Sequence, residues 1–179
     1  MITIRLASRS DVPEIGRIIQ SAIIQLQRGF LSAEEIAASR LFMGIDTQLL
    51  EDGTYFCAMI GHKVVGVGGW SWRRTLYGGE HAGALIDPAP LDPAREPARI
   101  RAMYTDPDFA RRGVGRALVA ASEKAASEAG FRTCELMSTL AGVPLYRICG
   151  YAPVGQPEAF PHEGVRVPLI RMCKSLDQP

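Results

Sequence analysis

The sequence has almost no excess of charge of either sign, since 20 Lys and Arg residues stand against 19 Asp and Glu residues in a chain of 179. The formal net charge of +1 excludes bulk electrostatic attraction to polyanions, so we expect no nucleic-acid partner. Hydrophobic residues make up 47% and charged residues 22%, which is typical of globular proteins and unlike disordered ones. The length indicates one domain that spans residues 1–179.

Cysteine is scarce, and its spacing excludes the common metal and redox motifs. The four cysteines are Cys57, Cys134, Cys149 and Cys173. They include no C-x-x-C pair and no Cys/His cluster with the spacing of zinc ligands. Each has apolar neighbours, which is typical of reduced, buried thiols that behave as small hydrophobic residues. We therefore expect neither a metal site nor a disulfide.

Long hydrophobic runs are also missing. The segment Met1–Leu6 lacks a basic leader followed by a long apolar region, so no signal peptide is indicated. The longest apolar stretch, 18–26, is interrupted by Gln20, Ser21 and Gln25 and is too short to cross a bilayer. These observations predict a cytoplasmic protein with no membrane partner.

Hydrophobic periodicity predicts an alternation of strands and helices. The predicted strands are 3–7, 54–60, 63–72, 98–105, 133–139, 151–154 and 165–172. The predicted helices are 11–28, 33–41, 113–129 and 142–149. Glycines at 66, 68 and 69 indicate either a bulge or a backbone that another group approaches closely. This order of elements favours a mixed sheet with helices on its faces.

Four local signals refine this prediction. Ser10 is the expected N-cap of the first helix, and Ser32 and Glu35 form a capping box that opens the second. Residues 73–97 show no period and contain four of the twelve prolines, which predicts a long loop. The last strand contains Pro168, which fits an edge strand better than a central one.

The clearest chemical signal lies where a strand ends, a short loop turns and a helix begins at Gly113 and Gly115. Backbone N–H groups at a helix N-terminus are unpaired and suit phosphate, and glycines let a ligand approach the backbone. Arg111, Arg112 and Arg116 add positive charge for an anionic ligand. The alternative interpretation is a glycine-rich helix start with solvated arginines.

Other phosphate-binding loops do not fit this segment. A dinucleotide-binding fingerprint needs Gly or Ala three residues after Gly115, where this sequence has Leu118. A Walker loop needs Gly-Lys-Ser/Thr, which occurs nowhere in the sequence. A nucleotide-binding domain of either kind is therefore disfavoured.

The residues around the two glycines resemble those of a known family. The run Met103-Tyr104-Thr105-Asp106-Pro107, the loop to Gly113 and the following Gly-x-Gly-x-Ala-Leu are similar to motif A of the GCN5-related N-acetyltransferase (GNAT) superfamily. The run Leu145-Tyr146-Arg147-Ile148-Cys149-Gly150-Tyr151 resembles the family's LYxxxGF/Y element. The resemblance covers nearly the whole chain. It implies an α/β (α+β) fold with a mixed, mostly antiparallel central sheet of about six to seven strands, flanked by helices on both faces.

The resemblance also implies acetyl-CoA as donor substrate and no metal. In the family, the strand before the loop holds the pantetheine arm, and the loop and helix start hold the pyrophosphate. The matching positions here are Met103, Tyr104, Thr105, Ala110, Arg111, Arg112, Gly113, Val114, Gly115, Arg116 and Ala117.

The implied reaction is direct attack of an acceptor, usually an amine, on the acetyl thioester. A backbone N–H of the strand at Met103–Thr105 would stabilise the oxyanion. Tyr146 matches the family's general acid, which protonates the leaving thiolate. The alternative interpretation of Tyr146 is a packed helix aromatic.

Two positions depart from the family pattern. The family often has Gln or Arg where this sequence has Ala110, and Arg111 or Arg112 would have to compensate. Many members have Asn where this sequence has Ala141. These departures leave a second hypothesis open, a non-catalytic acyl-CoA-binding domain of the same fold.

The general base is not identified by the sequence. Residues 98–105 contain no carboxylate, and a water chain is one alternative to a side-chain base. The remaining titratable candidates, each of which also fits a surface group, are Glu35, Asp52, Glu80, His81 and His162.

The acceptor is also left open, from proteins and polyamines to antibiotics and small metabolites. An aromatic and basic cluster comprises Trp70, Trp72, Arg73, Arg74 and Tyr77. It is interpreted either as a wall for an anionic or aromatic acceptor, or as packed tryptophans followed by a solvated basic turn. The expected partners are the acyl donor and this acceptor. Homodimerisation, common in similar families, is neither predicted nor excluded.

Overall fold

The computed structural model describes residues 1–40, 42–76, 87–162 and 164–176. In chain order they form β1 (Ile2–Leu6), α1 (Val12–Leu26), α2 (Ala33–Ser39), α3 (Thr47–Glu51), β2 (Tyr55–Ile60), β3 (Lys63–Ser71), β4 (Ala98–Thr105), α4 (Val114–Glu128), β5 (Thr133–Thr139), α5 (Val143–Ile148), β6 (Ala152–Pro153), β7 (Glu158–His162) and β8 (Val165–Ser175). The 3-10 helices Arg9–Asp11 and Pro107–Phe109 precede α1 and α4. No helix in these ranges is long and apolar enough to cross a membrane.

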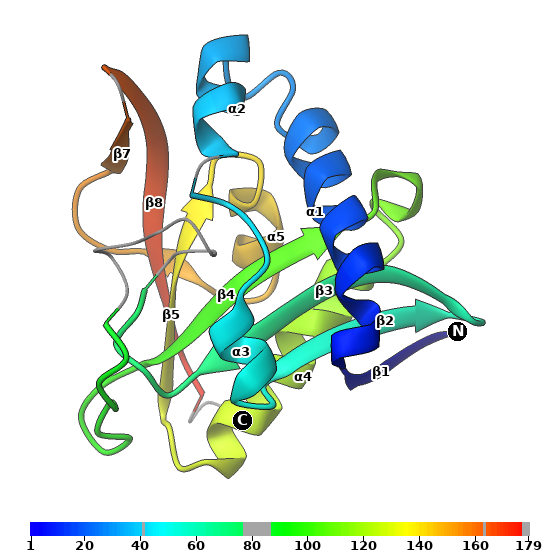
Figure 1. Cartoon of the computed structure of the whole chain (residues 1–179). Helices are drawn as coiled ribbons and strands as arrows, with labels where there is room; N and C mark the ends of the chain where they lie inside the picture. The colour runs from blue at the N-terminus through cyan, green and yellow to red at the C-terminus, as the bar shows by residue number, and fades with distance from the viewer. Residues whose placement is uncertain (41, 77–86, 163, 177–179) are drawn as a thin grey trace.

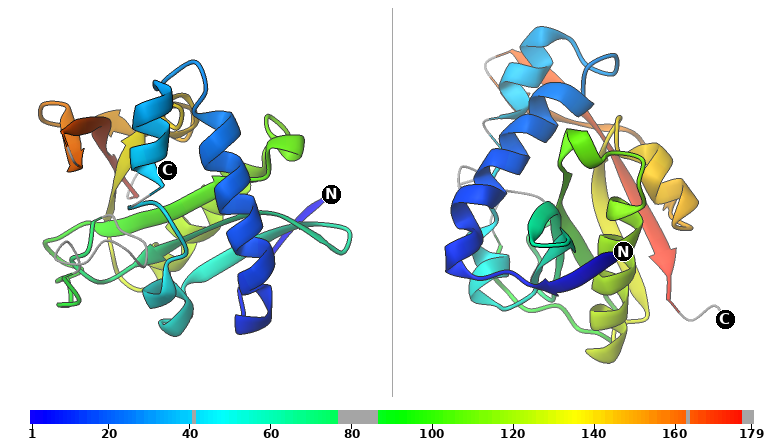
Figure 2. Two further views of the ribbon diagram at one scale, coloured as in Figure 1. Left: turned by 45° about the horizontal axis from the view of Figure 1, so that its top comes forward. Right: turned by 90° about the vertical axis from the view of Figure 1, so that its right-hand side faces the viewer.

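The strands form one twisted sheet in the order β1-β2-β3-β4-β5-β8-β6, with β7 paired to β8. Among these described strands, β4 and β5 form the parallel pair, and the other neighbours are antiparallel. Helices α1, α2 and α3 lie on one face of the sheet, and α4 and α5 lie on the other (Figures 1 and 2). The predicted fold, a mixed and mostly antiparallel sheet with helices on both faces, is confirmed.

The sheet opens at its centre, because β4 and β5 are paired at only two positions, Ala98 with Cys134 and Arg99 with Glu135. Beyond these positions, β4 continues along β3 and β5 continues along β8, and the two strands diverge (Figure 1). Parallel strands that separate leave backbone groups on their facing edges without a strand partner. The divergence therefore creates the setting for a ligand between two strands.

A bulge in β4 lies beside this opening. Its register with β3 shifts so that Ala102 and Met103 together face Gly68, and Ala102 has a positive φ of 53°. A Cβ at Gly68 would overlap the Met103 sulfur, and a Cβ at Gly66 would lie 2.6 Å from Cγ1 of Val114 in α4. Of the two alternatives for the β3 glycines, the close approach is thus confirmed, and the extra residue of the bulge opposite Gly68 belongs to the neighbouring strand β4.

The core is divided by the sheet. On one face, α1 buries Ile15, Ile18, Ile19 and Ile23 against β2 and β3. On the other face, apolar residues of α4 pack on the sheet together with Trp70 and Phe131. These four isoleucines lie on one side of α1 and hold the helix against the sheet, because each buried side chain contributes roughly 1.5–3 kcal/mol of hydrophobic stabilisation.

The helix starts are partly as predicted. The capping box of α2 is confirmed, with Glu35 N–H donating to Ser32 Oγ (3.2 Å) and Ser32 N–H donating to the Glu35 carboxylate (2.7 Å). Ser10 as the cap of the first helix is wrong, because the helical turn begins earlier. The Asp11 carboxylate accepts the backbone N–H of Ser8 (2.8 Å) and a bidentate contact from Arg5, which fixes a 3-10 turn before α1.

Helix α3 and strand β7 were not predicted. Helix α3 has five residues, too few to show a period, and begins at an Asp46 carboxylate that accepts the N–H of Leu49 (3.1 Å). Strand β8 is not an edge strand, since it pairs with β5 on one side and with β6 and β7 on the other. The β5 ladder ends at Leu169, so Pro168 itself has a strand neighbour on one side, which its missing N–H tolerates.

Candidate active site

A cavity of about 220 Å³ lies where β4 and β5 diverge. Its floor is formed by the β4 residues Ile100, Arg101, Ala102, Met103, Tyr104 and Thr105. Strand β5 contributes Met137 and Thr139, and the start of α5 contributes Gly142, Leu145 and Tyr146. The structure therefore brings the predicted strand residues 103–105 and the predicted Tyr146 to one cavity.

The β4 bulge determines how the strand faces the cavity. Ala102 and Met103 have no registered partner in either β3 or β5, the two described strands beside β4. The backbone there is available to a bound molecule. The Tyr104 side chain, by contrast, packs into the apolar cluster of α1 and β3, and burial raises the pKa of its hydroxyl well above the ordinary value.

The N-terminus of α4 adjoins the same cavity through α5. A Cβ at Gly115 would lie 2.7 Å from Cδ2 of Leu145, which lines the cavity. Gly113 caps the helix with a left-handed φ of 87°, and Arg111 has a φ of 63°. The loop therefore turns sharply into the helix, with a glycine where the backbone demands one.

The first turn of α4 offers free backbone donors. Ala117 donates its N–H to the Gly113 carbonyl (3.0 Å), so the N–H groups of Val114, Gly115 and Arg116 have no partner within the helix. Such groups and the helix dipole favour an anion. Arg111, Arg112 and Arg116 are exposed around this turn, whereas Ala110 and Ala117 are half-buried and Val114 is buried in the core.

Asp106 fixes the loop between β4 and α4. Its carboxylate is buried, pairs with Arg17 of α1 (2.7 Å) and accepts the N–H of Asp108 (3.1 Å). Burial opposes ionisation, but the contacts with Arg17 and the backbone outweigh it and lower the pKa of Asp106 below its ordinary value. Lys63 also lies 3.7 Å from this carboxylate. The predicted phosphate loop is therefore held by side chains from α1 and β3.

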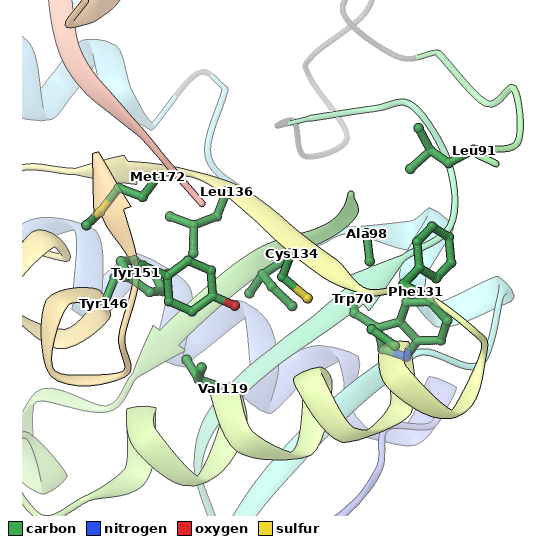
Figure 3. Packing of buried hydrophobic residues seen from close by; sticks show 12 residues of the cluster. Trp70, Leu91, Ala98, Val119, Phe131, Cys134, Leu136, Tyr146, Tyr151 and Met172 are labelled. Carbon is green, nitrogen blue, oxygen red and sulfur yellow. The ribbon is translucent and has the colours of Figure 1, made fainter. Parts of the chain in front are cut away.

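Tyr146 belongs to both the cavity wall and the core. Its ring meets that of Tyr151 edge to face, with centroids 5.8 Å apart (Figure 3). Gly142 leaves it room, because a Cβ there would lie 3.1 Å from Cε2 of the tyrosine. Burial raises the pKa of Tyr146, so the hydroxyl is protonated at neutral pH but is a weaker acid than an exposed tyrosine.

The candidate bases from the sequence are not at the cavity where the structure describes them. Glu35 is engaged in the α2 capping box, and Asp52 accepts two hydrogen bonds of 2.7 Å from Arg73. Neither lines the cavity. Glu80, His81 and the side chain of His162 lie outside the described part of the chain.

The aromatic and basic cluster is packed and paired. Trp70 lies edge to face with both Trp72 (5.6 Å) and Phe131 (6.0 Å) in the core. Arg73 binds Asp52, and Arg74 pairs with Glu96 (3.3 Å). None of these described residues lines the cavity, and Tyr77 lies outside the described ranges.

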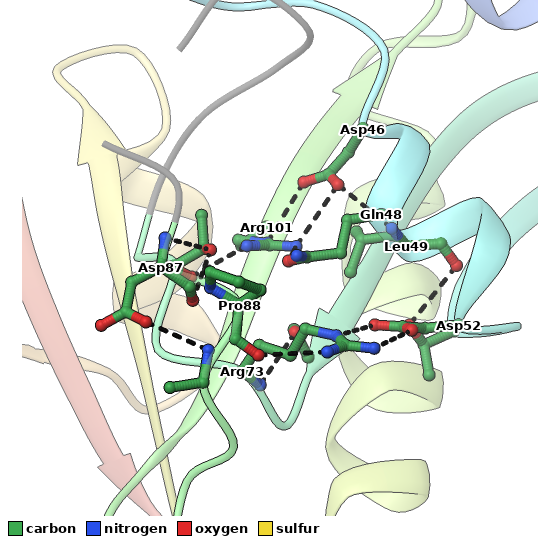
Figure 4. Close-up of polar contacts among 12 residues, drawn as sticks. Asp46, Gln48, Leu49, Asp52, Arg73, Asp87, Pro88 and Arg101 are labelled. Carbon is green, nitrogen blue, oxygen red and sulfur yellow. Dashed lines mark hydrogen bonds and ion pairs between the residues drawn. The ribbon is translucent and has the colours of Figure 1, made fainter. Parts of the chain in front are cut away.

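A buried ion pair beneath the cavity was missed from the sequence. Arg101 and Asp46, each 4% exposed, approach to 3.2 Å, and Arg101 also donates to Gln48 (2.9 Å) and to the carbonyl of Thr75 (2.9 Å) (Figure 4). Burial raises the pKa of Asp46 and lowers that of Arg101. The pair joins α3 and the start of the long loop to β4, one residue before the bulge. An Asp directly before the short helix Thr47–Glu51, in the N-cap position, was the available signal.

Hydrogen bonds join the two described ends of the long loop, residues 73–75 and 87–90. Thr75 and Asp87 exchange backbone and side-chain hydrogen bonds of 2.9–3.0 Å, and Arg73 and Pro90 form a β-bridge.

In the described residues, no group of three or more His, Cys, Asp or Glu side chains is placed to hold a metal ion.

Comparisons with known proteins agree with this geometry. A model of the acetyltransferase (GNAT) family matches residues 22–151. A GCN5-related N-acetyltransferase structure from Rhodopseudomonas palustris is 20% identical, with a TM-score of 0.72 over 97% of this chain and 95% of that one. Curated protein sequences give no significant match.

Two further solved structures share the fold and carry coenzyme A compounds. The PaiA N-acetyltransferase of Thermoplasma acidophilum, in complex with coenzyme A, is 14% identical (TM-score 0.61; 98% and 99% of the two chains). The yncA protein of Salmonella typhimurium, with its cofactor acetyl-CoA, is 17% identical (TM-score 0.65; 100% and 96%). Identities this low show the fold, and the family model covers most of the chain. The chain therefore belongs to the acetyltransferase (GNAT) family.

Proposed function

We propose that the protein is an N-acetyltransferase that uses acetyl-CoA as donor and transfers the acetyl group to an amine by direct attack on the thioester. The observation that carries this proposal is the meeting of the β4–β5 divergence and Tyr146 at one cavity. The glycine-capped start of α4 lies next to this cavity, where Gly115 packs closely against the lining residue Leu145. Membership in the family supports acetyl transfer in general.

The α4 turn provides the donor site in this proposal. The N–H groups of Val114, Gly115 and Arg116 bind the pyrophosphate, and the guanidinium groups of Arg111 and Arg112 add charge-assisted hydrogen bonds. The missing side-chain contact at Ala110 is thereby replaced by neighbouring charge. Coenzyme A compounds in proteins of the same fold support this assignment.

The opening between the strands provides the pantetheine site. The backbone of Met103–Thr105 lines the cavity, and on the side facing β5 it has no registered strand partner among the described residues. A ligand amide placed there would satisfy groups that the sheet leaves unpaired. The same backbone stabilises the oxyanion that forms when the amine attacks the thioester carbonyl.

Tyr146 then protonates the leaving thiolate. A thiol has an ordinary pKa of about 8.5 and a tyrosine one of about 10, and burial raises the pKa of Tyr146 further, so the transfer is uphill and depends on short-range positioning at the sulfur. Burial of the Tyr146 ring in the wall between Gly142 and Tyr151 supplies that positioning. In this proposal, residues 1–179 form a single catalytic domain that acts in the cytoplasm. It uses small-molecule substrates and needs no metal ion.

The test combines binding with turnover. Calorimetric titration with acetyl-CoA measures the donor site, and release of free thiol in the presence of a panel of amines measures transfer. The proposal predicts saturable binding and amine-dependent thiol release. Binding without thiol release from any amine would support the non-catalytic acyl-CoA-binding alternative instead.

A further inference from the structure

The wall of the cavity farthest from α4 is built from apolar side chains of distant segments. Helix α1 contributes three of them, the segment after α2 contributes two, and the others come from β5, β8 and the start of the long loop. These residues, called here the acceptor wall, are Ala22, Ile23, Leu26, Phe42, Met43, Leu76, Met137 and Leu169.

The acceptor wall continues into a closed apolar cluster. Phe42 is 4% exposed and stacks on Phe160 of β7, with ring centroids 4.1 Å apart. Leu169 and Met137 belong to the same cluster, which joins α2 to the β7–β8 hairpin. Helix α2 lies beside the start of β8, on the face of the sheet opposite to α4 (Figures 1 and 2). The cavity is therefore closed by hydrophobic packing at this end.

Charge is nearly lacking along the described lining of the cavity. Arg101 is the charged side chain among these residues, and its guanidinium is already bound to Asp46, Gln48 and Thr75. No carboxylate occurs among the described lining residues. An ammonium group moved from water into such surroundings loses its hydration and gains no counter-ion, which is costly.

We propose that the acceptor is a small primary amine on an uncharged apolar body, and that Phe42 and Met43 determine this preference. The inference rests on the proposed function and narrows it. The acceptor wall excludes a second cationic group, because the described lining provides no anion to receive it. It also disfavours a carboxylate, because Arg101 is already engaged. The reacting amine enters as the neutral base, the form that attacks a thioester.

Three amines of one chain length separate these requirements. They are 1-pentylamine, 1,5-diaminopentane and 5-aminopentanoate, which end in a methyl, an ammonium and a carboxylate group. We expect kcat/KM for thiol release to be about 30-fold higher for 1-pentylamine than for either charged analogue, per reactive amine. Equal or higher values for the diamine or the amino acid overturn the inference while leaving the proposed function standing.

A charge placed in the acceptor wall tests its role directly. Met43→Glu should raise the ratio of diamine to pentylamine kcat/KM about tenfold, and Met59→Glu, outside the cavity, should leave the ratio unchanged. An unchanged ratio in Met43→Glu with normal acetyl-CoA binding overturns the assignment of this wall.

Truncation provides an independent variant. Phe42→Ala should lower kcat/KM for 1-pentylamine about tenfold while preserving acetyl-CoA binding, and Phe30→Ala, at an exposed position, is the matched control. Equal losses in both variants contradict a specificity role. Acetyl-CoA binding without thiol release from any of these three amines overturns this inference, whereas the proposed function is contradicted when no amine of the wider panel releases thiol.

Discussion

The start of α4, called here the α4 end, and the acceptor wall differ in how they meet a ligand. The α4 end lies next to the cavity and exposes arginine side chains around the first backbone N–H groups of the helix, whereas the acceptor wall presents apolar side chains inside the cavity. Hydrogen bonds to a charged pyrophosphate are directional and depend on salt, while apolar contacts are neither. In the proposed function, a site that recognises charge thus lies next to a cavity that rejects it.

The buried Arg101–Asp46 pair is the exception to this division, because it places two charges beneath the apolar end. Asp46→Ala should cost about 3–5 kcal/mol of unfolding free energy, since it leaves the Arg101 guanidinium buried without its partner. Chemical denaturation measures this loss. The double variant Asp46→Leu with Arg101→Met should recover much of it, and a double variant as unstable as the single one would contradict the explanation.

Tyr146 lines the cavity, and in the proposed function it protonates the sulfur that leaves the acetyl group. Tyr146→Phe should reduce kcat by about 100-fold, because the leaving thiolate loses its proton donor, while acetyl-CoA affinity stays within about twofold. Tyr151→Phe, in the neighbouring ring, is the control and should retain near-normal kcat. Equal rates for wild type and Tyr146→Phe would remove this residue from the mechanism.

The arginines test the charge dependence of the α4 end. Removing both Arg111 and Arg112 by substitution with alanine should weaken acetyl-CoA binding about tenfold at low salt, and by less at high salt. Titration calorimetry at two salt concentrations measures the effect. Arg132→Ala, an exposed arginine elsewhere, should leave affinity unchanged. A loss that does not depend on salt would contradict an electrostatic role.

Asp106, which holds the loop before α4, should make the unfolding free energy of the protein depend on pH in the acid range. Folding lowers the pKa of this carboxyl, so its contribution is complete above the ordinary value near 4 and is lost as the pH falls below it. Asp106→Asn should therefore reduce unfolding free energy by about 1 kcal/mol at pH 7, and by less at pH 3. Equal losses at both pH values, measured by denaturation, would assign the effect to packing instead of charge.

The α4 end could be predicted from the sequence because its parts are contiguous. Gly113, Gly115 and three arginines lie within six positions, and the left-handed φ at Gly113 is a local demand of the chain. Tyr146 was found through a seven-residue element. Local signals of this kind are visible before any tertiary structure exists.

The acceptor wall could not be predicted in this way. Phe42 and Leu169 lie 127 positions apart in the numbering and meet only because β8 inserts between β5 and the β6 and β7 strands. Arg101 and Asp46 are likewise far apart in the sequence. Helix α3, which begins at Asp46, has five residues, too few to show a hydrophobic period. The strands other than β7 and the longer helices were predicted because each carries its own hydrophobic pattern, whereas the contacts between their side chains depend on the order of strands in the sheet.

The most direct test of the central claim is the fate of the acetyl group when wild-type protein is mixed with acetyl-CoA and 1-pentylamine. Mass spectrometry of the amine and titration of free thiol follow both products at once. The account predicts N-acetylpentylamine and free thiol in equal amounts, with little of either in Tyr146→Phe. Bound acetyl-CoA that remains intact beside unmodified amine would contradict it.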